Sequence, residues 1–262
     1  MSGRIRLAFE TVTKRFAHPR NGGRIVAIEG VDIDIADGER VALIGPSGCG
    51  KSTLLNLASG LDFPSEGRVK VDGAEVTGPN RQVAFMLQKD LLLPWRSIIE
   101  NVCFGQEIRG MSGAECRDKA QVQLKRFRIA DFADAYPHQL SGGMRQRAAL
   151  ARTMMMDPDV LLLDEPFSAL DAQTKLVLQA DLARTLTETR KTSFLITHDL
   201  DEAVTLSDRV LVMSKRPGRI VREIIVDLPH RDQPLERRRL PETARYTGEL
   251  MSLLDIGQAE LV

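Results

Sequence analysis

A glycine-rich stretch with one lysine and one serine has the residue types that hold phosphate groups. Residues 45–52 read Gly-Pro-Ser-Gly-Cys-Gly-Lys-Ser, which fits the phosphate-binding pattern G-x-x-x-x-G-K-S/T. Glycines let backbone N–H groups wrap around phosphate oxygens, and the N-terminus of a following helix adds positive potential. Lys51 then supplies a charge for the β- and γ-phosphates, and Ser52 offers a hydroxyl to Mg²⁺. The residues expected at this loop are Gly45, Pro46, Ser47, Gly48, Cys49, Gly50, Lys51, Ser52 and Thr53.

Two carboxylates follow an apolar run further along the chain. Val160–Leu163 is followed by Asp164 and Glu165, and ligands of open α/β folds bind at the carboxyl ends of the strands. Asp164 is predicted to hold Mg²⁺, directly or through water. Glu165 is placed to accept a proton from an attacking water or to orient it. The alternative is a solvated acidic turn before Pro166.

A third stretch, Leu140-Ser141-Gly142-Gly143, repeats the chemistry of the phosphate loop. Ser141 can cap a following helix, and the two glycines leave backbone N–H groups free to face an anion. In isolation, a plain helix N-cap is the favoured interpretation of these residues.

The elements that must position these residues follow from hydrophobic patterning. Three apolar runs, 41–44, 160–163 and 194–196, predict strands of a parallel sheet buried on both faces. Alternating residues near 5–9, 31–35 and 69–71 predict antiparallel strands. Residues from about 97 to 156 look helical, two more strands are expected at 210–213 and 220–226, and a helical tail follows. The predicted fold is α/β, with a P-loop core, an N-terminal antiparallel β subdomain and an inserted helical subdomain.

Taken together and in this order, the motifs resemble those of ATP-binding-cassette (ABC) ATPases over about residues 5–227. Residues 140–146, Leu-Ser-Gly-Gly-Met-Arg-Gln, look like the signature motif of that family. The resemblance implies an ABC ATPase domain over residues 1–230, with a helical subdomain inserted at about 91–156 and a tail over 231–262. It also implies that the chain binds and hydrolyses ATP with Mg²⁺.

The resemblance assigns roles to further residues. Gln88 looks like the glutamine that senses Mg²⁺ and γ-phosphate, which makes Ser52, Gln88 and Asp164 the expected metal ligands. His198 looks like the histidine that contacts γ-phosphate, and Asp171 belongs to a D-loop. Catalysis is expected from Glu165, His198, Gln88 and Lys51. Phe16 lies where the family stacks an aromatic ring on adenine, although a place in the core is an equal alternative.

The family also implies how two copies assemble. They are expected to associate head to tail, so that Ser141, Gly142 and Gly143 of one copy face the phosphate loop of the other across ATP. Residues 88–96, 101–105 and 213–220 are similar to ATPases of nitrate, sulfonate and taurine importers. Such an ATPase works with transmembrane permease subunits and indirectly with a solute-binding protein, at the cytoplasmic face of the inner membrane. An exporter ATPase and a soluble ABC ATPase remain alternatives, and the solute could also be a pyrimidine precursor or an aromatic acid.

The composition of the chain argues against two further classes, nucleic-acid-binding proteins and proteins that span a membrane. The chain has 262 residues, with 36 Lys and Arg against 36 Asp and Glu. A nucleic-acid-binding protein is usually basic, so no nucleic-acid partner is expected. No apolar stretch approaches the roughly 18 residues that span a bilayer, so other chains must supply any membrane part.

Three smaller features carry interpretations of their own. Cys49 lies beside Lys51 at a helix N-terminus, and both favour its thiolate. Apolar residues 91–95 are expected either to contact a partner helix or to pack internally. The arginine-rich stretch 209–245 is interpreted as a solvated face, with lipid headgroups or a partner as the alternative.

Overall fold

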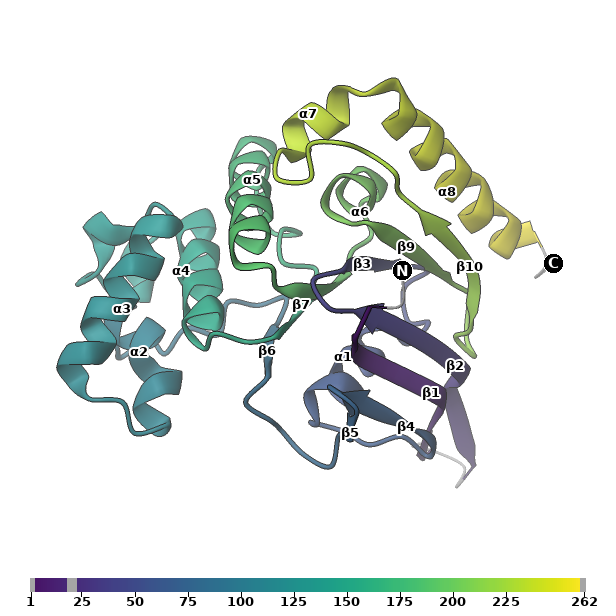
Figure 1. Ribbon diagram of the computed structural model, residues 1–262, viewed down its shortest axis with the longest axis horizontal. Helices are drawn as coiled ribbons and strands as arrows, with labels where there is room; N and C mark the ends of the chain where they lie inside the picture. The colour runs from purple at the N-terminus through teal and green to yellow at the C-terminus, as the bar shows by residue number, and fades with distance from the viewer. Residues whose placement is uncertain (1–2, 18–22, 260–262) are drawn as a thin grey trace.

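The computed structural model describes residues 3–17 and 23–259, which form two sheets and three groups of helices (Figure 1). The smaller sheet has the strand order β2-β1-β4-β5, and all of its pairs are antiparallel. Its strands are β1 (Ile5–Ala17), β2 (Arg24–Ala36), β4 (Glu66–Val71) and β5 (Ala74–Glu75). The predicted antiparallel strands near the N-terminus are therefore confirmed.

The larger sheet has the order β10-β9-β3-β8-β7-β6. It is parallel except at the β9–β10 pair. Its strands are β3 (Arg40–Ile44), β6 (Val83–Met86), β7 (Val160–Asp164), β8 (Thr192–Ile196), β9 (Arg209–Met213) and β10 (Ile220–Ile225). Every residue of β3 and β8 is buried, as expected for a sheet covered on both faces.

Helices cover both faces of this sheet because alternate strand residues point to opposite layers. Val41 and Leu43 pack with α1 (Lys51–Ser59) and the smaller sheet. Ala42 and Ile44 pack on the other face with α6 (Leu200–Leu206) and α8 (Pro241–Ala259). Two further helices, α5 (Ala172–Thr189) and α7 (Pro234–Arg239), lie beside α6 and α8 (Figure 1). The helix α1, which follows the phosphate loop, is thus held between the two sheets.

A group of three helices projects from the larger sheet between β6 and β7 (Figure 1). It comprises α2 (Ile98–Ile108), α3 (Gly113–Arg126) and α4 (Gly142–Met155), with short 3-10 turns at 130–132 and 137–139. Serines 97, 112 and 141 cap the three helices with their side chains. Apolar residues of α2, α3 and α4 share one buried cluster with β7. The inserted helical subdomain is therefore present.

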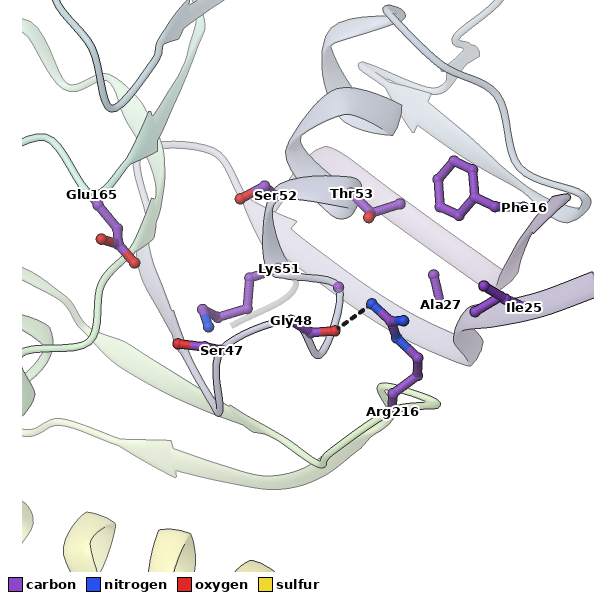
Figure 2. A pocket seen from close by; sticks show the side chains of 11 residues that line it. Phe16, Ile25, Ala27, Ser47, Gly48, Lys51, Ser52, Thr53, Glu165 and Arg216 are labelled. Atoms are coloured by element: carbon purple, nitrogen blue, oxygen red, sulfur yellow. Dashed lines mark hydrogen bonds between the residues drawn. The ribbon is translucent and has the colours of Figure 1, made fainter. Parts of the chain in front are cut away.

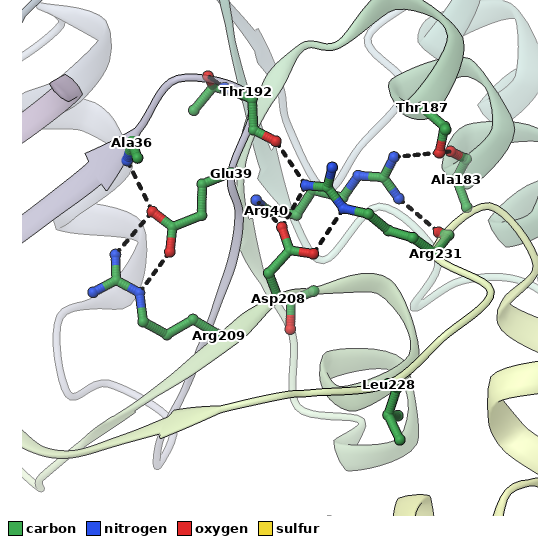
Figure 3. Close-up of polar contacts among 12 residues, drawn as sticks. Ala36, Glu39, Arg40, Ala183, Thr187, Thr192, Asp208, Arg209, Leu228 and Arg231 are labelled. Carbon is green, nitrogen blue, oxygen red and sulfur yellow. Dashed lines mark hydrogen bonds and ion pairs between the residues drawn. The ribbon is translucent and has the colours of Figure 1, made fainter. Parts of the chain in front are cut away.

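Arginines of the C-terminal stretch make polar contacts within the larger sheet and between it and the tail, and those of Arg209 and Arg231 are drawn in Figure 3. Arg209 Nε donates to Glu39 Oε1 at 2.8 Å, and Arg231 Nε donates to Asp208 Oδ1 at 2.7 Å. Arg237, only 2% exposed, donates to main-chain carbonyls, including that of Ser207 at 3.0 Å. The interpretation of this stretch as a solvated face is wrong for Arg209 and Arg237, because their charges are used inside the molecule. Residues 260–262, the end of the predicted tail, lie outside the described residues.

Candidate nucleotide site

A pocket of about 330 Å³ opens where α1 begins, between the smaller sheet and the carboxyl ends of the parallel strands (Figure 2). Eight of its lining residues were predicted from the sequence and three were not. The lining consists of Phe16, Ile25, Ala27, Ser47, Gly48, Gly50, Lys51, Ser52, Thr53, Glu165 and Arg216. The glycine-rich loop and the acidic strand end therefore meet at one site.

The loop between β3 and α1 depends on its glycines. Gly50 has φ +113°, and a Cβ there would lie 2.5 Å from Ile28 Cγ2 of β2. Only glycine accepts both the left-handed backbone and this close approach. Lys51 is 8% exposed, and its Nζ donates to the carbonyls of Gly45 and Pro46 at 2.8 and 2.9 Å. Its ammonium is therefore held within the curve of the loop, where it can meet phosphate oxygens.

The acidic pair lies at the end of β7. Burial raises the pKa of Asp164, and a hydrogen bond with Ser52 opposes that shift. Glu165 takes a left-handed backbone conformation, with φ +46°. Its Oε2 accepts a hydrogen bond from Gln88 Nε2 at 3.3 Å and lies 3.2 Å from His198 Nδ1. Two of the predicted catalytic side chains, Gln88 and His198, thus converge on the carboxylate of a third, Glu165, which is not a free acidic turn.

The donor set near Ser52 fits Mg²⁺. The Ser52 side chain acts to lower the pKa of the Asp164 carboxyl group against the effect of burial, so the two groups are neighbours. Gln88 follows β6, the strand that pairs with β7. Mg²⁺ prefers such oxygen ligands, and it is usually bound by one or two carboxylates together with substrate phosphates. No cluster of three or more His, Cys, Asp or Glu in residues 3–17 and 23–259 has metal-binding geometry. The site therefore suits a Mg²⁺ ion that is bound jointly by a few protein oxygens and by the phosphates of a nucleotide.

The far wall of the pocket is apolar and comes from β1 and β2. Phe16 is 41% exposed, and Lys14 Nζ lies 5.1 Å from the centre of its ring. The structure thus places Phe16 on the pocket wall and not in the core. Ile25 and Ala27 of β2 lie beside it (Figure 2). An exposed aromatic ring on an apolar wall can stack on a purine base.

Arg216 is the third lining residue that motif analysis missed. It lies in the loop between β9 and β10, and its Nη2 donates to the Gly48 carbonyl at 2.9 Å. The sequence does contain a signal for this residue, because residues 213–220 resemble importer ATPases, but the resemblance assigns no role to Arg216. Ile25 and Ala27 carried no such signal, because they are ordinary apolar strand residues.

The signature and D-loop residues lie apart from this pocket. Ser141, Gly142 and Gly143 begin α4 and do not line it. Ser141 Oγ accepts from Met144 N at 3.3 Å, so the serine is a helix N-cap in this single chain. Asp171 caps α5 in the same way, accepting from Thr174 N at 3.0 Å. Neither motif is thus part of the pocket lining, and the serine of one and the aspartate of the other act as helix caps in the single chain.

The thiol pKa of Cys49 is shifted in the direction opposite to the one predicted from Lys51 and the helix N-terminus. It is 1% exposed, and burial raises its thiol pKa against the opposing effect of Lys51. The interpretation that favoured a thiolate is therefore wrong. Desolvation of the charged form outweighs the nearby ammonium at this position.

Comparisons with known proteins agree with a nucleotide site built on a P-loop. The family model described as ABC transporter matches residues 28–168. The nitrate import ATP-binding protein NrtD of Synechocystis is 43% identical over 88% of this chain and 89% of its own length. The taurine import ATP-binding protein TauB of Jannaschia is 40% identical over 95% and 93%. A solved dimeric ATP-binding cassette bound to ADP and phosphate superposes with a TM-score of 0.76, at 32% identity, over 85% of this chain and 99% of that chain.

The fold and the site therefore define a P-loop ATPase of the cassette type. The chain belongs to the ABC transporter family, as an ATP-binding protein that hydrolyses ATP.

Proposed function

We propose that this chain is the ATPase subunit of an ABC importer for a small solute of the nitrate, sulfonate or taurine class. The observation that carries the proposal is that relatives named for nitrate and taurine import are 40–43% identical over most of the chain. Alkanesulfonates, pyrimidine precursors and aromatic acids belong to the same range of candidates. The solute would be selected by other chains, because the pocket described here is a nucleotide site.

Different residues along the pocket would bind the phosphates, bind Mg²⁺ and accept the proton. Lys51 and the N–H groups of the glycine-rich loop would hold the phosphates. Ser52, Gln88 and Asp164 would hold Mg²⁺, which neutralises charge developing on the phosphates. Glu165 would take a proton from the attacking water. His198, which already faces the same carboxylate, would contact the γ-phosphate.

We further propose that the site is completed by a second copy. Ser141, Gly142 and Gly143 are exposed or half-buried at the start of α4 and lie outside the pocket. Their N–H groups could reach a phosphate only across an interface. The solved neighbour that resembles this chain is a dimer, which supports a head-to-tail pair with ATP between the copies.

Permease subunits would anchor this pair to the cytoplasmic face of the inner membrane, and a solute-binding protein would deliver the solute. Residues 91–95 support such a contact, because Leu91 is 53% exposed and Trp95 is 72% exposed just beyond Gln88. Leu92, 8% exposed, packs internally instead. None of the helices within residues 3–17 and 23–259 is both long and apolar enough to span a bilayer.

The test is a pull-down of the tagged chain from detergent-solubilised membranes of its own source, with mass spectrometry of the captured proteins. A Trp95→Ala and Leu91→Ala double variant serves as the matched comparison. The proposal predicts a polytopic membrane protein in near-equal amount with the native chain and less of it with the variant. Capture of ribosomal or DNA-associated proteins, or of no partner, would overturn the importer assignment and leave the ATPase standing.

A further inference from the structure

Arg216 is a lining residue that lies outside the glycine-rich loop and brings a second positive charge to the pocket. No carboxylate among residues 3–17 and 23–259 forms an ion pair with it, whereas Arg219 in the same loop pairs with Glu29 at 2.6 Å. The guanidinium has five N–H donors in a planar fork. The hydrogen bond to the Gly48 carbonyl uses one of them. The others remain available to a ligand in the pocket.

The loop that carries Arg216 is held firmly against the nucleotide site. Gly218 N donates to the Ala27 carbonyl at 2.9 Å, and Glu29 N donates to the Gly218 carbonyl at 3.0 Å. A Cβ on Gly218 would lie 2.1 Å from the carbonyl oxygen of Cys49. Because this loop is fixed to both β2 and the phosphate loop, the guanidinium is positioned before any ligand binds. Such preorganisation lowers the entropic cost of a contact.

The position of the guanidinium along the pocket indicates which part of a nucleotide it meets. Lys51 and Glu165 mark one end, where the terminal phosphates belong, and Phe16 marks the other, where the base would stack. In Figure 2 the guanidinium lies between Gly48 and Ala27, on the wall that joins these ends. That place corresponds to the sugar and its adjoining phosphate. Lys51 and Arg216 are the two cationic side chains of the lining.

We infer that Arg216 is a second nucleotide-binding cation, which donates hydrogen bonds to the α-phosphate of ATP or ADP while holding the Gly48 carbonyl. This inference rests on the proposed nucleotide site. A guanidinium fork suits this task because charge-assisted hydrogen bonds to phosphate are about twice as strong as neutral ones. The contact is made equally to both nucleotides, so it contributes to affinity and not to the chemical step.

The test is isothermal titration calorimetry of MgADP, together with steady-state ATPase kinetics, on the full chain and its variants. Arg216→Ala should weaken MgADP binding and raise KM for ATP by about 10-fold each, because it removes a charged hydrogen bond. The value of kcat should stay within about twofold. Arg216→Lys, which keeps the charge, should recover most of the affinity. Arg219→Ala, the matched control in the same loop, should bind as the native chain does.

A thermal melt separates ligand contact from mere support of the loop. The inference predicts an unchanged Tm for Arg216→Ala without nucleotide, and a smaller rise in Tm on adding MgADP. Native affinity in Arg216→Ala, an effect on ATP but not ADP, or a lowered nucleotide-free Tm that explains the weaker binding would each overturn it. Lys51→Ala should lose MgADP binding in the same assay. If Lys51→Ala binds normally, the proposed nucleotide site itself fails.

Discussion

Glu165 is the residue on which the catalytic account depends. Its carboxylate meets Gln88 and His198, which come from the ends of two other strands of the same sheet. In the proposed mechanism, these two neighbours would orient the carboxylate so that it can accept a proton from water. The three polar side chains proposed for hydrolysis thus lie together at the carboxyl ends of β6, β7 and β8.

Replacing this base should separate binding from hydrolysis. Glu165→Gln should lower kcat by about 100-fold or more, because general-base catalysis contributes on that order. The affinity for MgATP should change little, since Lys51 and the loop N–H groups remain. Phosphate release and calorimetric titration measure the two quantities. Glu115→Gln, an exposed glutamate on α3, is the matched control, and near-native turnover in Glu165→Gln would remove the proposed role.

Most individual site residues could be predicted from the sequence because their motifs depend on local backbone geometry. Gly48 and Gly50 take positive φ angles in the loop before α1, and Lys51 begins that helix, so their pattern specifies the local backbone. Ile25 and Ala27 could not be predicted, since their side chains reach the pocket only through the packing of β2 on the glycine-rich loop. The state of Cys49 was missed for a related reason. Its neighbours in sequence predicted a thiolate, whereas its burial in the fold decides the pKa.

At the scale of elements, one ionic cluster joins α5 to the start of α6. Lys175 Nζ of α5 lies 2.7 Å from Asp199 Oδ2 and 2.9 Å from Glu202 Oε2. Glu202 is 2% exposed and also accepts from Gln179 Nε2 at 3.1 Å. Burial raises the pKa of Glu202, and the Lys175 ammonium opposes that rise. Because Asp199 follows His198 directly, the cluster fixes the strand end that presents the histidine.

Removing the lysine should produce a stability deficit that depends on pH. Lys175→Met leaves Glu202 buried without its ammonium and should lower the free energy of unfolding by about 3 kcal/mol near neutral pH. The Glu202 pKa then rises further, so the folded variant takes up a proton while the unfolded glutamate stays ionised. Acidification therefore favours the folded variant relative to the native chain, and the deficit shrinks as pH falls.

Urea denaturation at about pH 7.5 and 5.5 measures this difference. Lys119→Met is the matched control, because Lys119 pairs with Glu115 on the surface of α3 at 55% and 53% side-chain exposure. That control should cost about 0.5 kcal/mol or less at both pH values. A Lys175→Met deficit that grows on acidification would contradict the role given to the Lys175 ammonium, which is to oppose the rise in the Glu202 pKa.

The main strands could also be predicted, because their apolar residues follow recognisable patterns along the sequence. Buried runs such as Val160–Leu163 indicated a parallel sheet, and the alternation near Val31–Ile35 indicated a strand with one solvent-facing side. The use of the C-terminal arginines was not predictable. Arg237 caps main-chain carbonyls 30 and 32 residues away in sequence, and only the docking of α7 on α6 brings them together. Charge counts along a chain do not report such contacts.

At the scale of the whole molecule, the separation of the motifs is the main finding. The glycine-rich loop, Asp164 and Glu165 meet in one copy, whereas Ser141 and Asp171 lie at the starts of α4 and α5, outside the pocket. In the proposed head-to-tail pair, each copy would supply the glycine-rich loop to one site and Ser141 to the other. If two copies close around ATP, each site is completed, and loss of the γ-phosphate can release the pair. The permease would convert this closing and opening into transport.

The most direct test of this account is sedimentation of the Glu165→Gln variant with MgATP and with MgADP. The account predicts a doubled mass with MgATP and a monomer with MgADP, because the γ-phosphate joins the two copies. Adding Ser141→Arg to the same variant should leave ATP binding intact and abolish the dimer. A Glu165→Gln chain that stays monomeric with MgATP, or a double variant that dimerises as well, would contradict the composite site.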